Sequence, residues 1–471
     1  MRGAWIQGLL LAAGVVNAQT PAPEPFRALD VRLELTIDHP NRQLRGAITY
    51  EIENWTGTPA RHVSFLVGRL MVATAVHDGR GASLRYVQDV ERFHDDPMRQ
   101  VTRIQVSLPR PIAAGGRTTV RVDYFGNLVG YTEVGWLYVR DRIDTAFTII
   151  REDALAFPVI GSLSDAANRQ RPRSDFTYDV AVRVPTRYLV ATGGAPTRTS
   201  HDDGTATWRY RSGAPSPFLN VTVAPYDTIV GGGIRLFHFS TDSLGARRTF
   251  ANAQAALRLL GSWFGPQRAM FTVTIAEIPD GWGSQASLVG GIIQSAAVFR
   301  DPGRSGELYH ELSHLWNARD TDTPSPRWNE GLASFLEGLM REQLDGWSNR
   351  RESEQRLIAW MQGRIASDSV LRVTPMIEYG RRGATDYSYS AGELMFATLY
   401  DLVGEAEFNA IVGGYYQQFT NGGSTLDFVA LAKRTSSRNL GRFFDDWLFT
   451  TRWTEQLRTA GSIGELVSHY R

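Results

Sequence analysis

Two histidines stand four residues apart in the segment His310-Glu311-Leu-Ser-His314. An α-helix completes a turn in about 3.6 residues, so side chains at this spacing leave the same face about 6 Å apart. Two imidazole nitrogens can then bind one Zn²⁺ at about 2.0–2.1 Å. Glu311 projects to the side, where its carboxylate can reach a water molecule on the metal. The segment therefore predicts a zinc site, with His310 and His314 as ligands and Glu311 as a base. The alternative is a surface helix that carries two histidines by chance.

A catalytic zinc ion needs a third protein ligand and an open position for water. The only histidine after His314 lies at the end of the chain, so a carboxylate is the expected third ligand. Glu330 follows Trp-Asn at the predicted start of the next amphipathic helix and is the preferred candidate. Asp320 and Asp322, on the intervening loop, are rivals. Glu337, two turns further along the helix, is expected to be solvated or to support a ligand.

Three motifs resemble the membrane alanyl aminopeptidase family of gluzincin metallopeptidases. They are the His310–His314 segment, the run that begins at Trp328-Asn-Glu330-Gly, and Tyr389-Ser-Ala-Gly. The continuation of the first motif, His314-Leu-Trp-Asn, is similar to the related glycyl aminopeptidases. The resemblance extends over most of the mature chain.

The resemblance implies a secreted zinc metallopeptidase, aminopeptidase-like, with one Zn²⁺ per chain and a peptide as substrate. Glu311 would act as the catalytic base. Tyr389 would be the hydroxyl that donates a hydrogen bond to the negative charge developing on the substrate carbonyl oxygen. Tyr387 is its nearest competitor, and a tyrosine packed in the core is the structural alternative.

The likeness weakens at the segment that holds the substrate's free α-amine. Where the family has Gly-x-Met-Glu-Asn, this chain has Gly283-Ser-Gln285-Ala-Ser, and a neutral amide attracts an ammonium group less than a carboxylate does. Glu152, just before Phe157-Pro158, is a second candidate for substrate binding. Two alternatives follow: an endopeptidase of the same fold with no requirement for a free amine, and a non-catalytic peptide-binding member. A serine hydrolase is not favoured, because the chain has no Gly-x-Ser-x-Gly segment.

The elements that position these residues form two parts. Short alternating segments such as Val31–Ile37 predict an antiparallel β-sandwich or saddle over residues 27–232. Gly231-Gly-Gly233 marks the expected boundary. Residues 233–471 read as a mainly helical domain, which the resemblance identifies as a thermolysin-like catalytic domain without the further helical domain of larger members. The expected fold class is therefore α+β and multidomain.

Helix ends can also be predicted from capping residues. Ser305 is the expected N-cap of the helix that carries the two histidines, and Ser325-Pro326 the expected start of the helix that carries Glu330. In the second helix Trp328, Leu332 and Phe335 line one face, which predicts that this face is buried.

Composition and charge indicate where the protein is expected to be located and which classes of partner it is expected to bind. The chain has 471 residues, a net charge of +1 and no basic block, so nucleic acid is not an expected partner. Residues 1–18 have the pattern of a secretory signal peptide cleaved after Ala18, with a retained anchor as the alternative. Residues 19–26 read as a flexible lead. The mature chain has no further apolar run long enough to span a membrane and contains no Cys, which favours a bacterial periplasm or exterior.

Overall fold

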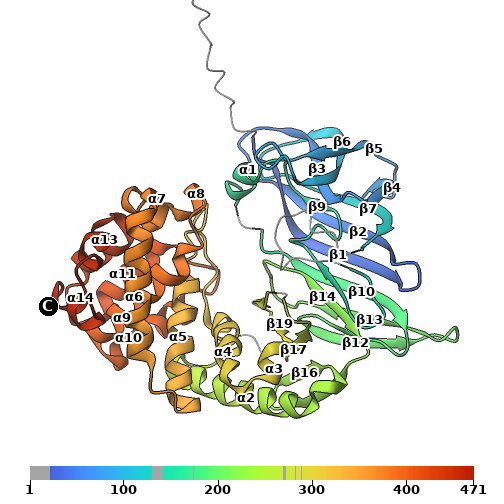
Figure 1. The fold of residues 1–471 in the computed structure, drawn as a ribbon. Helices are drawn as coiled ribbons and strands as arrows, with labels where there is room; N and C mark the ends of the chain where they lie inside the picture. Colours follow the sequence, from blue (N-terminus) through green and yellow to red (C-terminus); the bar gives the residue numbers. More distant parts are fainter. Residues whose placement is uncertain (1–21, 130–141, 173, 269–271, 282, 288) are drawn as a thin grey trace, which may run out of the picture.

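The computed structural model describes residues 22–129, 142–172, 174–268, 272–281, 283–287 and 289–471. Strands dominate its first half and helices its second (Figure 1). The expected α+β fold class, with a β-rich part before a mainly helical part, is confirmed.

The largest element is a seven-stranded sheet in which buried and exposed residues alternate. In β1, for example, Val31, Leu33 and Leu35 are buried while Glu34 is exposed, as expected for strands with one face on the core. Neighbouring strands are antiparallel except for β1 and β10. In spatial order the strands are β12 (Ala195–Ser200), β13 (Thr205–Arg211), β10 (Thr177–Pro185), β1 (Phe26–Asp38), β2 (Gln43–Asn54), β7 (Arg117–Asn127) and β4 (Met71–Asp78).

Two smaller sheets complete the β-rich part. One contains β5 (Arg85–Arg92), β6 (Gln100–Ile112), β3 (Ala60–Gly68) and β9 (Val159–Ile160), and the other β11 (Leu189–Ala191), β14 (Asn220–Ala224) and β8 (Thr148–Arg151). Ile48 of the large sheet, Phe65 of the four-stranded sheet and Val221 of the three-stranded sheet belong to one buried apolar cluster. The three sheets therefore share a core.

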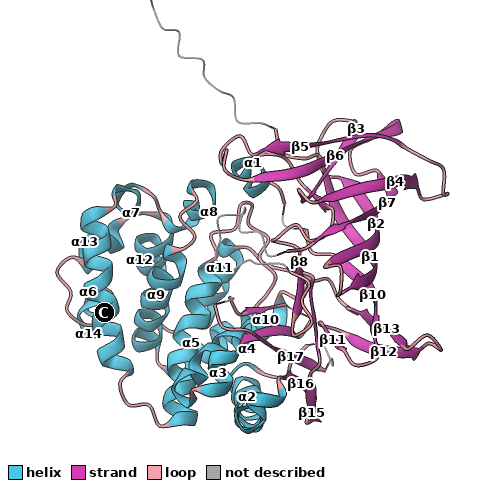
Figure 2. Cartoon of the chain, turned by 45° about the vertical axis from the view of Figure 1, so that its right-hand side comes forward, coloured by secondary structure: helices cyan, strands magenta, loops and turns pink. Residues whose placement is uncertain are grey.

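A five-stranded sheet connects the β-rich part to the helices (Figure 2). Its order is β15 (Asp227–Gly231), β16 (Ile234–His238), β17 (Val273–Ile278), β19 (Gly291–Ser295) and β18 (Gln285–Ala286). Gly231–Gly233 was the expected domain boundary. In the structure β15 and β16 pair with each other, and Gly232 and Gly233 form the turn of this hairpin within the sheet.

The helical part packs around one large apolar cluster that also includes residues of the five-stranded sheet. Its longer helices are α2 (Ser243–Phe264), α4 (Ser305–Ser313), α5 (Trp328–Asp345), α6 (Arg350–Ser367), α9 (Tyr387–Val403), α10 (Glu405–Gln418) and α11 (Thr425–Thr435). Shorter helical segments are α1 (Asp165–Arg169), α3 (Ala296–Arg300), α7 (Ser369–Val373), α8 (Tyr379–Arg382), α12 (Gly441–Phe444), α13 (Arg452–Leu457), α14 (Ile463–Ser468) and the 3₁₀ turn η3 (His314–Trp316). The other short turns are η1 (Ser240–Asp242), η2 (Pro302–Arg304), η4 (Met376–Glu378) and the π-helical η5 (Asp445–Phe449). Trp328, Leu332 and Phe335 are buried as predicted.

Both predicted helix starts are wrong. Ser305 is the first residue of α4, and its hydroxyl donates a hydrogen bond to Asp345 at the end of α5 rather than capping its own helix. α5 begins at Trp328, after Arg327 in the left-handed conformation, while the hydroxyl of Ser325 binds Asp320. The partner of Ser305 is distant in sequence, whereas Ser325 bonds within its own loop, to Asp320 and to the backbone N–H of Arg327.

The N-terminal residues also differ from expectation. The predicted signal peptide at 1–18 lies outside the described residues. Of the predicted flexible lead, residues 22–26 are described, and Glu24 and Phe26 are buried. Glu24 accepts a hydrogen bond from the backbone of Ser64, and its carbonyl accepts one from the indole of Trp55, so this part of the lead is anchored. Among the described residues, no helix has both the length and the apolar character needed to cross a membrane.

Candidate zinc site

Two neighbouring helices supply the predicted metal ligands. His310 lies on α4, and His314 begins the 3₁₀ turn η3 that continues α4. Glu330 lies in the first turn of α5. Leu308 and Leu312 of α4 pack in the same buried cluster as the apolar face of α5, which places the polar ligands between the two helices.

The three ligand side chains converge to the spacing that zinc requires. One carboxylate oxygen of Glu330, Oε2, lies 3.5 Å from His310 Nε2 and 3.3 Å from His314 Nε2. A tetrahedral ion with bonds of about 2.0–2.1 Å separates its ligand atoms by about 3.3–3.4 Å. Among the described residues, this trio is the group whose His, Cys, Asp and Glu ligand atoms converge closely enough to hold a metal. The geometry and the two-nitrogen, one-oxygen donor set therefore fit a catalytic zinc ion.

Each ligand has a polar neighbour on the side away from the metal position. Glu337 Oε2 lies 3.9 Å from His310 Nδ1, and the Asn317 side-chain amide lies 2.9 Å from His314 Nδ1. Such neighbours fix the orientation of an imidazole that binds metal through its other nitrogen. Glu337 is thus a support for a ligand, the role preferred from the sequence.

Electrostatics keep the carboxylate of Glu330 ionised. Burial alone would raise its pKa, but the nearby His314, hydrogen bonds with both histidines and the Arg327 guanidinium together hold the pKa well below its usual range. An ionised carboxylate is the form that binds a metal cation. Glu330 is therefore held in the form that a carboxylate ligand needs in order to bind a metal ion.

Glu311 has a different environment on the same helix. Its side chain is buried, and desolvation raises the pKa to about 7, although the charge of His310 and a hydrogen bond from the backbone N–H of Ala286 oppose the shift. A carboxyl group with a pKa near neutrality can both accept and donate a proton at pH 7. That is the property of a general base that later acts as an acid.

Tyr389 lies beside the ligands, and its competitor does not. The ring of Tyr389 stacks on His310 at 6.0 Å between centroids, and its hydroxyl lies 3.3 Å from Arg327 Nη2. Burial raises the pKa of this phenol well above its usual value, so it keeps its proton. The hydroxyl of Tyr387 instead contacts Arg364 and Asp368.

The rival candidates, Asp320 and Asp322, form hydrogen bonds that stabilise the loop between α4 and α5 and do not join the metal ligands. Asp320 accepts hydrogen bonds from the backbone N–H of Asp322 and from Ser325. Asp322 accepts hydrogen bonds from the backbone N–H and the hydroxyl of Thr425 at the start of α11. These contacts connect the α4–α5 loop to the C-terminal helices.

The two candidate substrate-binding residues each contact the chain at the start of β14. Glu152 is half-buried and accepts a hydrogen bond from the backbone N–H of Leu219, and desolvation of its carboxyl group raises the pKa to about 8. Gln285, in the edge strand β18, accepts a hydrogen bond from the Asn220 side chain at 2.5 Å. The next residue in the chain, Ala286, donates its backbone N–H to Glu311. Strand β18 therefore lies beside α4.

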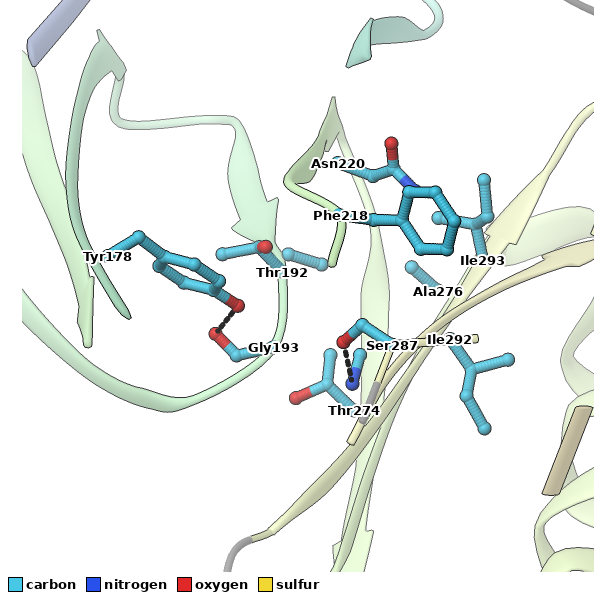
Figure 3. A pocket seen from close by; sticks show the side chains of 12 residues that line it. Tyr178, Thr192, Gly193, Phe218, Asn220, Thr274, Ala276, Ser287, Ile292 and Ile293 are labelled. Atoms are coloured by element: carbon cyan, nitrogen blue, oxygen red, sulfur yellow. Dashed lines mark hydrogen bonds between the residues drawn. The ribbon is translucent and has the colours of Figure 1, made fainter. Parts of the chain in front are cut away.

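Two cavities lie beside Phe218, close to the start of β14. Phe218 and Asn220, from the β-rich half, and Ile293, from the five-stranded sheet, line one of them (Figure 3). Phe218 also lines a second cavity, together with Glu152 and Arg171.

The sequence did not identify Asn317, Arg327 or Asn220 as members of the site. Asn317 follows His314 by three residues and ends the motif that resembles glycyl aminopeptidases, whereas for Arg327 the spacing of three residues before Glu330 is the only signal. Asn220 reaches Gln285 through the fold alone, because the two residues are far apart in the sequence.

The chain has the fold of M1 zinc metallopeptidases. The structure of the M1 zinc metallopeptidase from Deinococcus radiodurans is 21% identical with a TM-score of 0.62, covering 91% of this chain and 95% of that one. A mutant of that enzyme bound to a Tyr-Ser-Ala substrate is 21% identical with a TM-score of 0.63, covering 90% and 94%. Native yeast LTA4 hydrolase is 15% identical with a TM-score of 0.66, covering 90% and 68%. Protein-family models give no match, and neither do the sequences of curated proteins.

Proposed function

We propose that this chain is a zinc metallopeptidase of the aminopeptidase type, which hydrolyses the peptide bond after the first residue of a peptide. The observation that carries the proposal is the convergence of His310, His314 and Glu330 at tetrahedral spacing beside Glu311. The fold shared with the Deinococcus enzyme, whose mutant is bound to a tripeptide substrate, supports a peptide as the ligand here.

His310, His314 and Glu330 would hold the ion, which when bound supplies a Lewis acid for the peptide carbonyl and acidifies a water molecule. Glu311 accepts the proton of the attacking water and delivers it to the leaving amine, a transfer for which a pKa near 7 is suited. Tyr389 keeps its proton and donates a hydrogen bond to the carbonyl oxygen as that oxygen becomes negatively charged.

Glu152 is the proposed anchor for the substrate's α-ammonium group, and Gln285 would contribute a neutral amide. In the empty site Glu152 carries a proton at pH 7, because burial raises its pKa to about 8. An ammonium group at this position favours the ionised form of the carboxylate, so binding and ionisation occur together. Secretion remains a proposal that rests on the apolar segment before Ala18.

The direct test is the substitution Glu311→Gln. We expect the wild-type protein to contain one zinc ion per chain and to hydrolyse peptides. Glu311→Gln should retain zinc but lose activity by about 10²- to 10⁴-fold, the usual contribution of a general base. Zinc content by elemental analysis and peptide turnover by chromatography measure the two properties separately.

The matched control is Glu307→Gln, which changes a carboxylate on the same helix that pairs with Arg304. It should leave both zinc content and activity unchanged. A wild-type protein that binds zinc but cleaves no member of a peptide library would exclude an enzyme and favour a non-catalytic peptide-binding protein.

A further inference from the structure

Arg327 has an unusual backbone conformation at the entrance to α5. Its φ of 57° and ψ of 29° lie in the left-handed region, which is sterically costly for a residue with a Cβ. Among the non-glycine residues that the structure describes, only Arg42 and Leu155 share a positive φ. Strain of this kind persists where surrounding contacts require it, and it is concentrated at functional sites.

The contact that this conformation produces is a short ion pair with a metal ligand. Arg327 Nη2 donates to Glu330 Oε1 at 2.7 Å, while the other oxygen, Oε2, faces the two histidines. The two oxygens of one carboxylate are thereby assigned to different partners. A carboxylate held in this way offers a single oxygen to a metal ion.

The same nitrogen of Arg327 reaches Tyr389. Nη2 lies 3.3 Å from the tyrosine hydroxyl oxygen, and the guanidinium carbon lies 5.8 Å from the ring centroid. The Tyr389 hydroxyl also interacts with the carboxylate of Glu330. The three side chains therefore form a triangle: Arg327 and Tyr389 contact each other, and both interact with the carboxylate of Glu330.

This triangle affects how readily the hydroxyl of Tyr389 can exchange its hydrogen bond with Glu330 for one with a substrate oxygen. An ionised carboxylate without a cation would hold the phenol O–H in a charge-assisted hydrogen bond. Arg327 already satisfies Oε1, so transferring the hydrogen bond of Tyr389 to a substrate oxygen leaves no buried carboxylate oxygen unpaired. Nη2 carries two N–H groups, one for each partner, and the planar, always-charged guanidinium fixes their directions, which the freely rotating ammonium of a lysine does not.

We propose that Arg327 is a positioning residue that fixes Glu330 as a one-oxygen zinc ligand and frees the hydroxyl of Tyr389 for the substrate carbonyl. The part that concerns zinc depends only on the metal site. The part that concerns turnover rests on the proposed peptidase function.

The zinc test compares Arg327→Met with the wild-type chain by competition against a chelator. We expect the zinc dissociation constant to rise by about 10- to 100-fold, the usual effect of removing a residue that orients a metal ligand. The matched control is Arg381→Met, which removes an exposed arginine that also pairs with a glutamate three residues away, Glu378. The control should bind zinc as the wild type does. An unchanged dissociation constant in Arg327→Met would overturn the proposal.

The turnover test uses saturating zinc and the variants Arg327→Met, Tyr389→Phe and their combination. Arg327→Met should lower kcat by about 10-fold or more while KM stays within about twofold, because the lost interaction acts in the transition state. The double variant should be no slower than Tyr389→Phe alone, since the arginine acts through the tyrosine. Losses that multiply in the double variant would overturn this role.

Arg327→Lys is the second variant, and it serves if Arg327→Met does not fold. It keeps the charge and loses the planar geometry, so zinc affinity should fall less than in the methionine variant and kcat should still fall. Zinc affinity and kcat equal to those of the wild type would show that charge alone suffices, against the proposal. If the wild-type chain cleaves no peptide, the proposed function fails, while the zinc measurement still decides the role of Arg327 at Glu330.

Discussion

At the scale of single residues, the site shifts the pKa values of two neighbouring carboxyl groups in opposite directions. Glu330 is held ionised by His314 and Arg327, whereas burial raises the pKa of Glu311 to about 7. Neighbouring titratable groups with opposite shifts are the usual arrangement for assigning one to charge stabilisation and the other to proton transfer. Here the assignment matches a metal ligand and a general base.

Glu152, the proposed anchor of the substrate's amine, can be tested by its effect on specificity. We expect the wild-type enzyme to cleave peptides with a free amine and to leave N-acetylated versions almost intact. Glu152→Gln should lower kcat/KM for the free peptides by about 10- to 100-fold, the value of one hydrogen bond to a charged group. Kinetics on matched free and acetylated peptides measure the effect.

Gln285→Glu provides the complementary variant. It adds a carboxylate one residue before the position that matches the Glu of the family that the sequence resembles, and Asn220 can still donate to it. Selectivity for the free amine should therefore increase. Equal cleavage of free and acetylated peptides by the wild-type chain would instead identify an endopeptidase.

The sequence predicted the ligand types and their spacing but not the residues that hold them. His310, His314 and Glu330 follow from a helical repeat and from the ligand set of catalytic zinc. The position of Arg327 depends on a left-handed turn that no local pattern required. A guanidinium three residues before a carboxylate usually lies on a helix surface, so its spacing alone could not show that it faces the site.

At the scale of elements, a glycine crossing sets the distance between α5 and α9. A Cβ on Gly331 would lie 2.4 Å from the Cα of Gly392, so the two helices approach to backbone contact there. Gly331 directly follows Glu330, and Gly392 lies almost one turn after Tyr389. The crossing therefore determines how close the tyrosine comes to the metal ligand.

Gly331→Ala should destabilise the protein by about 2–3 kcal/mol, the usual effect of overpacking a closely packed core. Peptide turnover should fall as well, because α9 must move away from α5. Urea unfolding and turnover measure the two effects.

Gly363→Ala is the control, since a Cβ at this position of α6 meets no atom within 4 Å. It should stabilise the chain by about 0.5–1 kcal/mol through its higher helix propensity. If Gly331→Ala behaved like this control, the crossing would not be tight.

Apolar periodicity located most helices of the second half, and their ends were less predictable. Ser305 was expected to cap α4, but its hydroxyl binds Asp345, which is distant in sequence. His314 was expected to continue a regular α-helix, and the structure places it in a 3₁₀ turn. The first outcome depends on a tertiary contact that local sequence patterns do not encode, and the second follows the common tightening of a last helical turn into 3₁₀ geometry.

At the scale of the whole molecule, the stability of the chain should depend on pH through its anchored N-terminal segment. Glu24 is buried beside Ser64, and desolvation raises its pKa from 4.5 to about 8 despite the charge of Arg171. The folded state thus binds this proton more tightly than the unfolded state. The associated stability is complete below about pH 4.5 and is lost as pH rises to about 8.

Glu24→Gln should remove most of this dependence, because the amide is neutral and its oxygen can still accept from Ser64. The variant should match the wild type near pH 4.5 and exceed it by roughly 3–5 kcal/mol above pH 8. Glu352→Gln, an exposed helix carboxylate, is the control and should follow the wild-type curve. Parallel curves for Glu24→Gln and the wild type from pH 4.5 to 8.5 would contradict the assignment.

The order of the two parts was predictable from strand and helix periodicity, whereas their junction was not. Gly231–Gly233 has the composition of a linker, yet β15 and β16 pair across it. Composition reports where the chain can turn, but not whether the strands on either side join the same sheet. The apolar cluster that includes Phe147, Phe237 and Ile293 then joins the three-stranded and five-stranded sheets.

The arrangement of the site along the chain has a consequence for folding. His310 to Glu330 forms one helix–loop–helix segment, so all three metal ligands meet through contacts that are local in sequence. Glu152 reaches Leu219, and Gln285 reaches Asn220, only when distant parts of the chain close on each other. Contacts with short sequence separation form sooner than long-range ones. We therefore expect the metal ligands to come together early in folding, and the two candidate substrate-binding residues to reach their places only when distant parts of the chain have closed on each other.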